Sequence, residues 1–362
     1  MKRRQFLIAA AATPALAQVP GWAIAQQLPF NPKPGNWRTF ELVSRVEIAK
    51  PTGATKVWIP LPAVESDYQR PVADSWTGNA SKATVVSDGK YGAKMLMAEF
   101  SPTESLPWVE VTSRFQTRDR AIDLSAGGAK LSREERAFYT EATSLMPTDG
   151  IVRKTALEAT KGAKTEMDKA RALYEWIVDN TFRDPKTVGC GRGDVKVMLE
   201  TGNLSGKCAD LNALYVALAR SVGLPARDVY GLRVAKSAFG YRSLGAGTDN
   251  VTRAQHCRAE VFVNGPGWIP VDPADVRKVV LEEKPAPVTL ADPVVPPVRA
   301  RLFGAWEMNW LAYNDAHDVK LPGSSGEVLG FLMYPQAETG GKRVNPYAPD
   351  DFKYKLTSKE IA

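Results

Sequence analysis

The stretch SGKCADLNALYVALARSVGLPAR, residues 205–227, combines a helical apolar pattern with a cysteine at its beginning. Four apolar residues recur at helical spacing: Leu211, Leu214, Leu218 and Val222. Gly223 and Pro225 end the pattern, because glycine favours the cap that follows a helix and proline cannot continue one. The sequence therefore predicts a helix that carries Cys208 in its first turn.

The first turn of a helix favours the ionised form of a thiol. The leading N–H groups of a helix have no intrahelical partner, and the macrodipole places about half a positive charge there. Both effects lower the pKa of Cys208, and Lys207 adds a nearby cation. Gly206 is expected to leave space for a substrate to reach the sulfur. The alternative is that Cys208 is a small buried hydrophobic residue.

A thiolate nucleophile needs an imidazole beside it and a group that orients the imidazole. Residues 255–271 predict a β-hairpin that carries one of the two histidines, with the strands QHCRAEVFV and WIPV joined by NGPG. This register places Asp272 opposite Arg258 or Ala259, diagonal to His256 and on the same face of the sheet. For His256 alone, a structural role is an equally good interpretation.

These segments together resemble the bacterial transglutaminase-like superfamily. GKCADLNAL with GLPAR is similar to its cysteine motif, QHCRAEVF to its histidine motif and GWIPVDPA to its aspartate motif, in the same order. The resemblance covers about residues 145–280 and includes the run YEWIVDNTF, residues 174–182. It implies a papain-like cysteine protease core with Cys208 as nucleophile, His256 as base and Asp272 as the group that orients the base.

The fold class that follows is α+β. A helix carrying the cysteine is expected to pack on an antiparallel sheet carrying the histidine and the aspartate. Two positions differ from the family pattern: Arg258 occupies a place where an aromatic residue is common, and Phe182 one where tyrosine is common. Neither belongs to the predicted triad.

The predicted reaction is acyl transfer through a thioester, with hydrolysis of a peptide or isopeptide favoured over cross-linking. The Cys208 backbone N–H would help to hold the oxyanion, and Asn203 and Asn180 are weak candidates for a second donor. The expected substrate is a peptide, a protein or a peptidoglycan-derived fragment. The alternative is a catalytically idle binding or assembly module of the cell envelope.

No cofactor and no metal are expected. After His256, only His317 remains as an imidazole ligand, and it is predicted to lie at the surface. The other two cysteines, Cys190 and Cys257, leave two possibilities open: a disulfide behind the site, or two unpaired buried thiols.

The N-terminus predicts export from a bacterial cell. Residues 1–25 contain a basic start, an apolar run too short to span a bilayer and a small-residue cleavage site, and the RRQFL run resembles a twin-arginine signal. Its removal lowers the net charge from +7 to +4, too little to indicate nucleic-acid binding. The mature chain is predicted to lack a transmembrane segment and to be periplasmic or secreted.

Three regions are expected after the signal. Residues 26–125 contain five short alternating segments that predict strands, at 40–48, 55–59, 82–86, 94–100 and 108–115. Together they predict an antiparallel β-sandwich, which would narrow access to the site. Residues 126–284 predict the catalytic core. Residues 285–362 predict a Pro-rich linker and a β extension that packs on the core.

Overall fold

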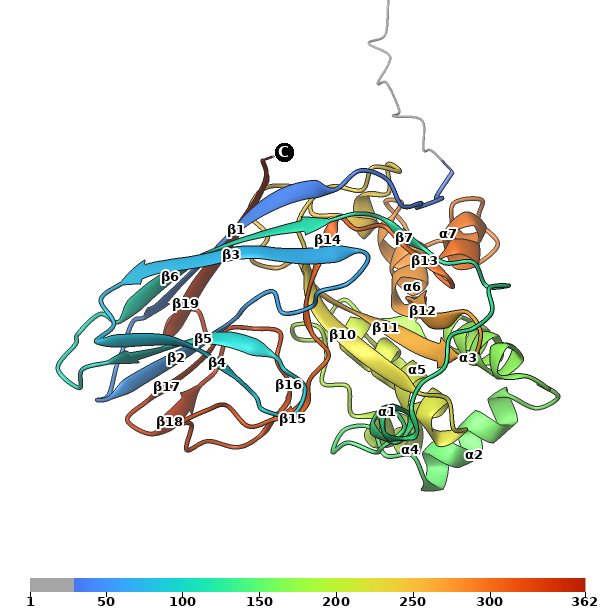
Figure 1. The fold of residues 1–362 in the computed structure, drawn as a ribbon, viewed down its shortest axis with the longest axis horizontal. Coiled ribbons are helices and arrows are strands. Elements are labelled where there is room, and N and C mark those ends of the chain that lie inside the picture. Colours follow the sequence, from blue (N-terminus) through green and yellow to red (C-terminus); the bar gives the residue numbers. More distant parts are fainter. Residues whose placement is uncertain (1–28, 362) are drawn as a thin grey trace, which may run out of the picture.

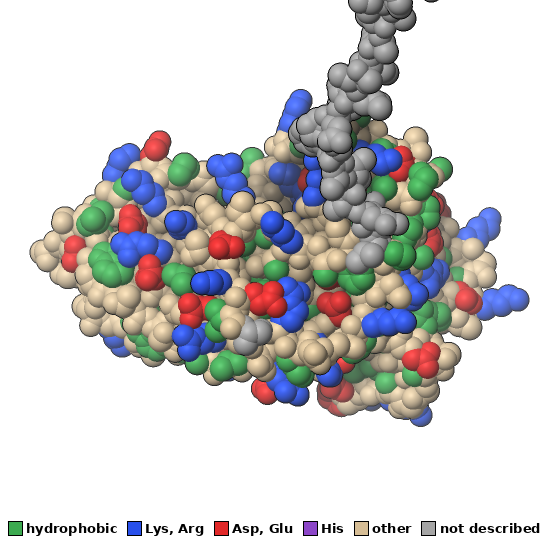
Figure 2. Space-filling view, turned by 90° about the horizontal axis from the view of Figure 1, so that it is seen from above, with side chains coloured by type: hydrophobic (Ala, Val, Ile, Leu, Met, Phe, Trp, Pro, Cys, Tyr) green, Lys and Arg blue, Asp and Glu red, His purple; other side chains and the backbone are tan. Residues whose placement is uncertain are grey.

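The computed structural model describes residues 29–361, so the predicted export signal lies outside the described residues. A β-sandwich occupies one side of the molecule, and a core of helices and strands occupies the other (Figure 1). Within residues 29–361, no helix is long and apolar enough to cross a membrane. On the face shown in Figure 2, cationic and anionic side chains are mixed, as a small net charge would suggest.

The sandwich has two sheets whose inner faces share one apolar cluster. The first sheet has the strand order β19-β1-β6-β3, with β1 (Arg38–Ile48), β3 (Gln69–Gly78), β6 (Trp108–Thr117) and β19 (Phe352–Glu360). The second has the order β18-β17-β2-β5-β4, with β2 (Thr55–Pro60), β4 (Lys82–Ser87), β5 (Lys94–Phe100), β17 (Gln336–Thr339) and β18 (Lys342–Val344). Alternation along β1 and β6 buries every second side chain. Val46, Ile48, Val109 and Val111 lie in the cluster between the two sheets, whereas Phe40, Leu42 and Phe115 pack with Leu232 and Leu311 of the core.

The structure confirms the five strands that alternation predicted within residues 40–115: β1, β2, β4, β5 and β6. Strand β3 was missed. It is an edge strand that contains Pro71, and most of its side chains are exposed, so it shows no alternating burial. An edge strand with one partner tolerates such a sequence, because only one side of its backbone must pair.

The prediction that residues 285–362 pack on the core is wrong in part. Only β14 (Trp310–Asn314) joins the core sheet, whereas β17, β18 and β19 complete the two sheets of the sandwich. The Pro-rich segment also contains a short helix, α7 (Val295–Arg301), because Pro296 and Pro297 occupy its first turn, where no backbone N–H is needed. The sandwich is therefore built from both ends of the chain.

The core is organised by one antiparallel sheet with the order β12-β11-β10-β14. Its other strands are β10 (Ala226–Arg233), β11 (Gln255–Val263) and β12 (Gly267–Val271). The remaining helices are α1 (Arg133–Phe138), α2 (Gly150–Ala159), α3 (Glu166–Asn180), α4 (Val195–Thr201), α5 (Cys208–Ser221), α6 (Pro273–Glu282) and the 3-10 turn η1 (Arg242–Leu244). Short strand pairs complete the chain: β7 (Arg120–Ala121) with β13 (Ala305–Trp306), β8 (Phe182–Arg183) with β9 (Ser205–Gly206), and β15 (His317–Val319) with β16 (Leu329–Phe331).

Helix α5 is the centre of the core. All of its fourteen residues are buried, and it packs on β10 and β11 while α2, α3, α4 and α6 surround it. A helix buried on every side cannot shift without disturbing all of these elements, so its first residue is held firmly in place. The predicted α+β class and the packing of this helix on an antiparallel sheet are confirmed.

Candidate functional site

Cys208 is the first residue of α5 and is 3% exposed. Just before it, the parallel pair β8–β9 ties the approach to the helix to residues 182–183. Asp210, in the first turn, accepts hydrogen bonds from the backbone N–H groups of Lys207 (2.9 Å), Arg192 (3.0 Å) and Gly193 (2.9 Å). One carboxylate therefore fixes both the start of the helix and the glycine-rich loop beside it.

The expectation that Gly206 leaves room for a substrate is wrong. A Cβ at this position would collide with the Asp210 side chain, and the same is true at Gly191, whose φ is +96°. These glycines are needed so that the backbone can approach the carboxylate, and at Gly191 also for the left-handed conformation. Gly191 and Gly206 therefore hold the glycine-rich loop against Asp210, and they affect Cys208 only by fixing where it lies.

The β11–β12 hairpin places His256 and Asp272 as the register predicted. Ala259 pairs with Val271, which puts Asp272 opposite Arg258. The His256 Nε2 atom lies 2.7 Å from Asp272 Oδ2. Asp272 is also the N-cap of α6, where its Oδ1 accepts the Asp275 N–H at 3.0 Å. This carboxylate is completely buried and held by its own helix, so it can fix the orientation of the imidazole.

Three further buried charges surround this pair and were not predicted. Asp275 lies 3.4 Å from His256 Nε2 and forms an ion pair with Arg233 at 2.5 Å. Arg258 approaches Asp272 at 3.4 Å and donates a hydrogen bond to the Glu307 carbonyl at 2.9 Å. The guanidinium of Arg258 also lies 4.7 Å from the centre of the Trp310 ring. Arg258, which replaces the aromatic residue common in the family, therefore neutralises the carboxylate of Asp272, the group that orients His256.

The electrostatics of the site favour an ionised sulfur. Burial raises the pKa of the Cys208 thiol, but interactions of its sulfur with Cys190, Cys257 and His256, together with the charge of the imidazole, lower it well below the ordinary value. Burial and Arg233 lower the pKa of His256, but Asp275 and Asp272 outweigh them and raise it to about 9. A thiolate and an imidazolium are thus the favoured pair near pH 7.

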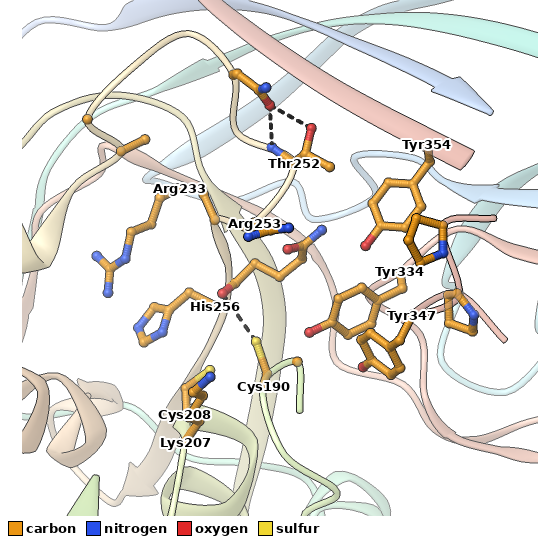
Figure 3. Close-up of a pocket in the computed structure, with 18 of the residues that line it drawn as sticks. Cys190, Lys207, Cys208, Arg233, Thr252, Arg253, His256, Tyr334, Tyr347 and Tyr354 are labelled. Atoms are coloured by element: carbon orange, nitrogen blue, oxygen red, sulfur yellow. Dashed lines mark hydrogen bonds between the residues drawn. The ribbon is translucent and has the colours of Figure 1, made fainter. Parts of the chain in front are cut away.

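All three cysteines are buried free thiols, so of the two possibilities for Cys190 and Cys257 the structure has the unpaired one. The Cys190 Sγ donates a hydrogen bond to the Gln255 carbonyl at 3.2 Å (Figure 3). Its own carbonyl accepts the N–H of Ala209, the residue after Cys208, at 2.9 Å. Cys190 is therefore locked between the glycine-rich loop and the start of α5.

A cavity of about 750 Å³ opens at Cys208 and His256. Its walls come from the start of α5, from β10 and β11 and from residues 346–354, which lead into β19 of the sandwich. In Figure 3, Cys190, Cys208 and His256 lie at the base of the cavity, and a group of tyrosines stands at one side. One wall is thus supplied by the C-terminal segment that completes the sandwich. Among the described residues, none of 29–125 lines the cavity, so the expectation that this N-terminal region narrows access is not supported.

The two asparagines considered as oxyanion donors are engaged locally. Asn203 accepts hydrogen bonds from the backbone and side chain of Ser205, and Asn180 donates to the Trp176 carbonyl at 2.8 Å. Neither lines the cavity. The Ala209 N–H is bound by the Cys190 carbonyl and the Lys207 N–H by Asp210, so the Cys208 N–H remains the donor that the helix itself supplies there.

The prediction that His317 is a surface residue is wrong. It is 3% exposed, and its Nδ1 lies 3.1 Å from the Tyr230 hydroxyl. Burial, together with Arg220 and Lys90, holds its pKa well below the ordinary value, so it is a neutral structural histidine. The sequence around His317 offered no sign of this burial, because β15 has only three residues and pairs with another three-residue strand, β16.

His256, Asp272 and Asp275 bring three ligand atoms within 4.8 Å of one another, a grouping that a metal ion could use. Two guanidinium groups already neutralise the carboxylates: Arg233 pairs with Asp275 and Arg258 with Asp272. A divalent cation would have to displace these buried ion pairs. The donor set therefore fits a charge network around an imidazole better than it fits a metal centre.

Comparisons with known proteins agree with this geometry. Residues 153–273 match the Transglutaminase-like superfamily. A Haemophilus influenzae protein of uncharacterized function is 35% identical over 341 residues, which cover 89% of this chain and 91% of that protein. The crystal structure of a candidate cysteine protease from Cytophaga hutchinsonii covers 90% of this chain and 99% of its own, with a TM-score of 0.50 and 15% identity.

The periplasmic domain of TgpA from Pseudomonas aeruginosa matches less closely, with a TM-score of 0.33 and 15% identity over 65% of this chain and 91% of that domain. The sequence match spans the Cys208 helix and the His256–Asp272 hairpin, and the Cytophaga structure shares the fold. The chain belongs to the transglutaminase-like superfamily.

Proposed function

We propose that this protein is an exported, cysteine-dependent acyl-transfer enzyme that cleaves a peptide or isopeptide amide. The observation that carries the proposal is the position of Cys208 at the start of a buried helix, in the same cavity wall as a histidine held by a carboxylate at 2.7 Å. In this proposal Cys208 is the nucleophile, His256 the general acid and base, and Asp272 the group that orients the imidazole.

The reaction would begin with attack of the Cys208 thiolate on the amide carbonyl. The oxyanion would face the Cys208 N–H at the start of α5, and the intermediate would collapse as His256 gives its proton to the departing amine. This leaves a thioester on Cys208 and a neutral imidazole. Water, deprotonated by His256, would then attack the thioester, release the acid and restore the thiolate and the imidazolium.

Hydrolysis is favoured over cross-linking because the cavity is roomy and lined by charged and hydroxyl-bearing side chains, which attract water. A cross-linking enzyme must instead keep water from the thioester until an amine arrives. The expected substrates are peptides, proteins or peptidoglycan-derived fragments. Screening these against the full chain and against Cys208→Ala, with mass detection of free acids and of amide cross-links, separates the two outcomes.

A catalytically idle binding or assembly module is the alternative, and thiol reactivity distinguishes it. With a lowered pKa, Cys208 should react with iodoacetamide at pH 6.5 at least 10-fold faster than glutathione does, because most glutathione is protonated there. Labelling is followed by mass spectrometry of the peptide that contains Cys208. A rate equal to that of glutathione would support the idle module and contradict the enzyme.

Export is proposed from residues 1–25 alone. Fractionation of cells that produce the full chain should place it in the envelope, and Arg3→Lys with Arg4→Lys should retain it in the cytoplasm if the twin-arginine route is used. An unchanged distribution of the double variant would instead indicate a plain secretory signal.

A further inference from the structure

The cavity at Cys208 has an unusual charge distribution. Its lining contains six cationic side chains: Arg183, Lys207, Arg233, Arg253, Lys278 and Lys353. Among the described residues, no Asp or Glu side chain lines it. The whole sequence has 47 basic and 40 acidic residues, so a lining with one sign of charge does not follow from overall composition. Such a concave surface focuses a positive potential on its interior.

Part of this charge is balanced from behind the wall. Arg233 pairs with Asp275 at 2.5 Å. Arg183 and Lys278 share one carboxylate, Glu282, which lies 3.8 Å from the Lys278 ammonium. Two cations with a single partner leave one positive charge without compensation. The pKa of Lys278 is lowered to about 8 by burial and by repulsion from Arg233 and Arg183, as expected in a positive field.

The remaining cations have no carboxylate partner among the described residues. The Lys207 ammonium donates a hydrogen bond to the neutral Thr187 carbonyl at 2.7 Å, and forms no ion pair within that part of the chain. Arg253 and Lys353 are exposed at the rim and also form no ion pair there. Their side chains are available to a ligand.

The opposite wall carries hydroxyl donors. Tyr334, Tyr347 and Tyr354 stand together across from Arg253 in Figure 3. Burial raises the pKa of all three, that of Tyr354 to about 12, so the hydroxyls stay protonated and can donate hydrogen bonds. The cavity thus offers donors from both sides.

We propose that the cavity selects an anionic acyl donor: a peptide with a carboxylate close to the amide that Cys208 attacks. This inference rests on the proposed function, because it describes the substrate of the same site. Arg253 and Lys353 would attract and bind the carboxylate at the rim. Lys207, beside the nucleophile, would favour a negative charge near the reacting carbonyl.

Two alkylating reagents of different charge test this inference. The Cys208 thiolate displaces iodide from either iodoacetamide, which is neutral, or iodoacetate, which carries a carboxylate at the required place. The two rates are measured on the Cys208 peptide by mass spectrometry, and their ratio is divided by the ratio for glutathione. The full chain is compared with Arg253→Gln/Lys353→Gln, and with Lys154→Gln/Lys161→Gln as a control that removes two exposed charges outside the cavity.

The normalised ratio of iodoacetate to iodoacetamide should exceed one in the full chain and fall about 10-fold in the rim variant. The control variant should keep the ratio of the full chain, and 0.5 M salt should lower the ratio of the full chain toward that of the rim variant. Because the His256 imidazolium is present in every variant, its own attraction for iodoacetate cancels in the comparison.

Fast reaction with iodoacetamide but an unchanged ratio in the rim variant would overturn the inference and leave the proposed function intact. An equal fall in the control variant would also overturn it, because the effect would then come from net charge. Glutathione-like rates with both reagents would overturn the proposed function, and the inference with it.

Discussion

The two halves of this molecule use charge in opposite ways. In the sandwich, ion pairs such as Arg38–Glu360, at 2.7 Å, lie at the surface, and the space between the sheets is apolar. In the core, Asp272, Asp275 and Glu260 are almost completely buried and each faces a guanidinium group or an imidazole. Buried charges are costly unless paired, so the core retains an arrangement that stability alone would not favour.

The comparison shows where each half derives its rigidity. The sandwich is held by apolar burial between two sheets, for which many sequences would serve. The core is held by charges whose partners must be in place, and two of them, Asp272 and Asp275, converge on His256. Such an arrangement supports chemistry because it fixes the protonation and the direction of one imidazole.

The largest expected effect comes from His256. His256→Ala removes the group that stabilises the thiolate, so labelling of Cys208 by iodoacetamide at pH 6.5 should slow by about 1,000-fold. His317→Ala, which also removes a buried histidine but lies outside the cavity, is the matched control and should label at the original rate. Equal rates in the full chain and His256→Ala would show that the two residues are not paired.

Next in size is the contrast between buried and exposed ion pairs. Glu260 is fully buried between Arg120 and Arg227, with Arg227 at 2.6 Å, so Glu260→Gln leaves two cations without their partner. The free energy of unfolding, from urea titration, should fall by about 3 kcal/mol. Glu360→Gln in the sandwich should cost less than about 1 kcal/mol. Similar losses in the two variants would mean that ion pairs contribute equally to the stability of the core and of the sandwich.

A smaller effect is expected in the glycine-rich loop. Gly191→Ala introduces a methyl group that collides with Asp210 at a left-handed backbone position, and should destabilise the protein by about 2 kcal/mol. Gly162→Ala is the control, since Gly162 has a similar φ, +87°, with nothing within 4 Å of the added Cβ, and should cost about 1 kcal/mol. Equal losses would attribute the whole effect to backbone strain.

The smallest change should accompany pH. Between pH 8.5 and 6.5 the iodoacetamide rate at Cys208 should vary less than about threefold, because its pKa is lowered well below the ordinary value of a thiol, whereas the rate of a free thiol falls about 50-fold. A fall of Cys208 labelling parallel to that of glutathione would contradict the ion pair between the Cys208 thiolate and the His256 imidazolium.

The charge of His256 also makes the stability of the protein depend on pH. Its pKa is raised to about 9, so the stability that this charge contributes is present at low pH and lost as pH rises through 9.

Local patterns were sufficient to predict much of the site. The helix that begins at Cys208 follows from apolar spacing and a terminal glycine, and the hairpin register of His256 and Asp272 follows from an alternating strand and a short turn. Both signals are short in range and depend on backbone geometry. The charges around His256 were missed because Arg233, on β10, meets Asp275, on α6, only after the sheet has formed.

The sequence by itself determined most of the elements, although not β3 or α7, together with the order of the three reactive residue types and the family. Only the tertiary structure decided the rest: that β17–β19 return to the sandwich, that residues 346–354 form a wall of the cavity, and that its lining is cationic. Strand pairing and cavity walls join residues more than one hundred positions apart. No local periodicity encodes such contacts, because they depend on the packing of whole elements.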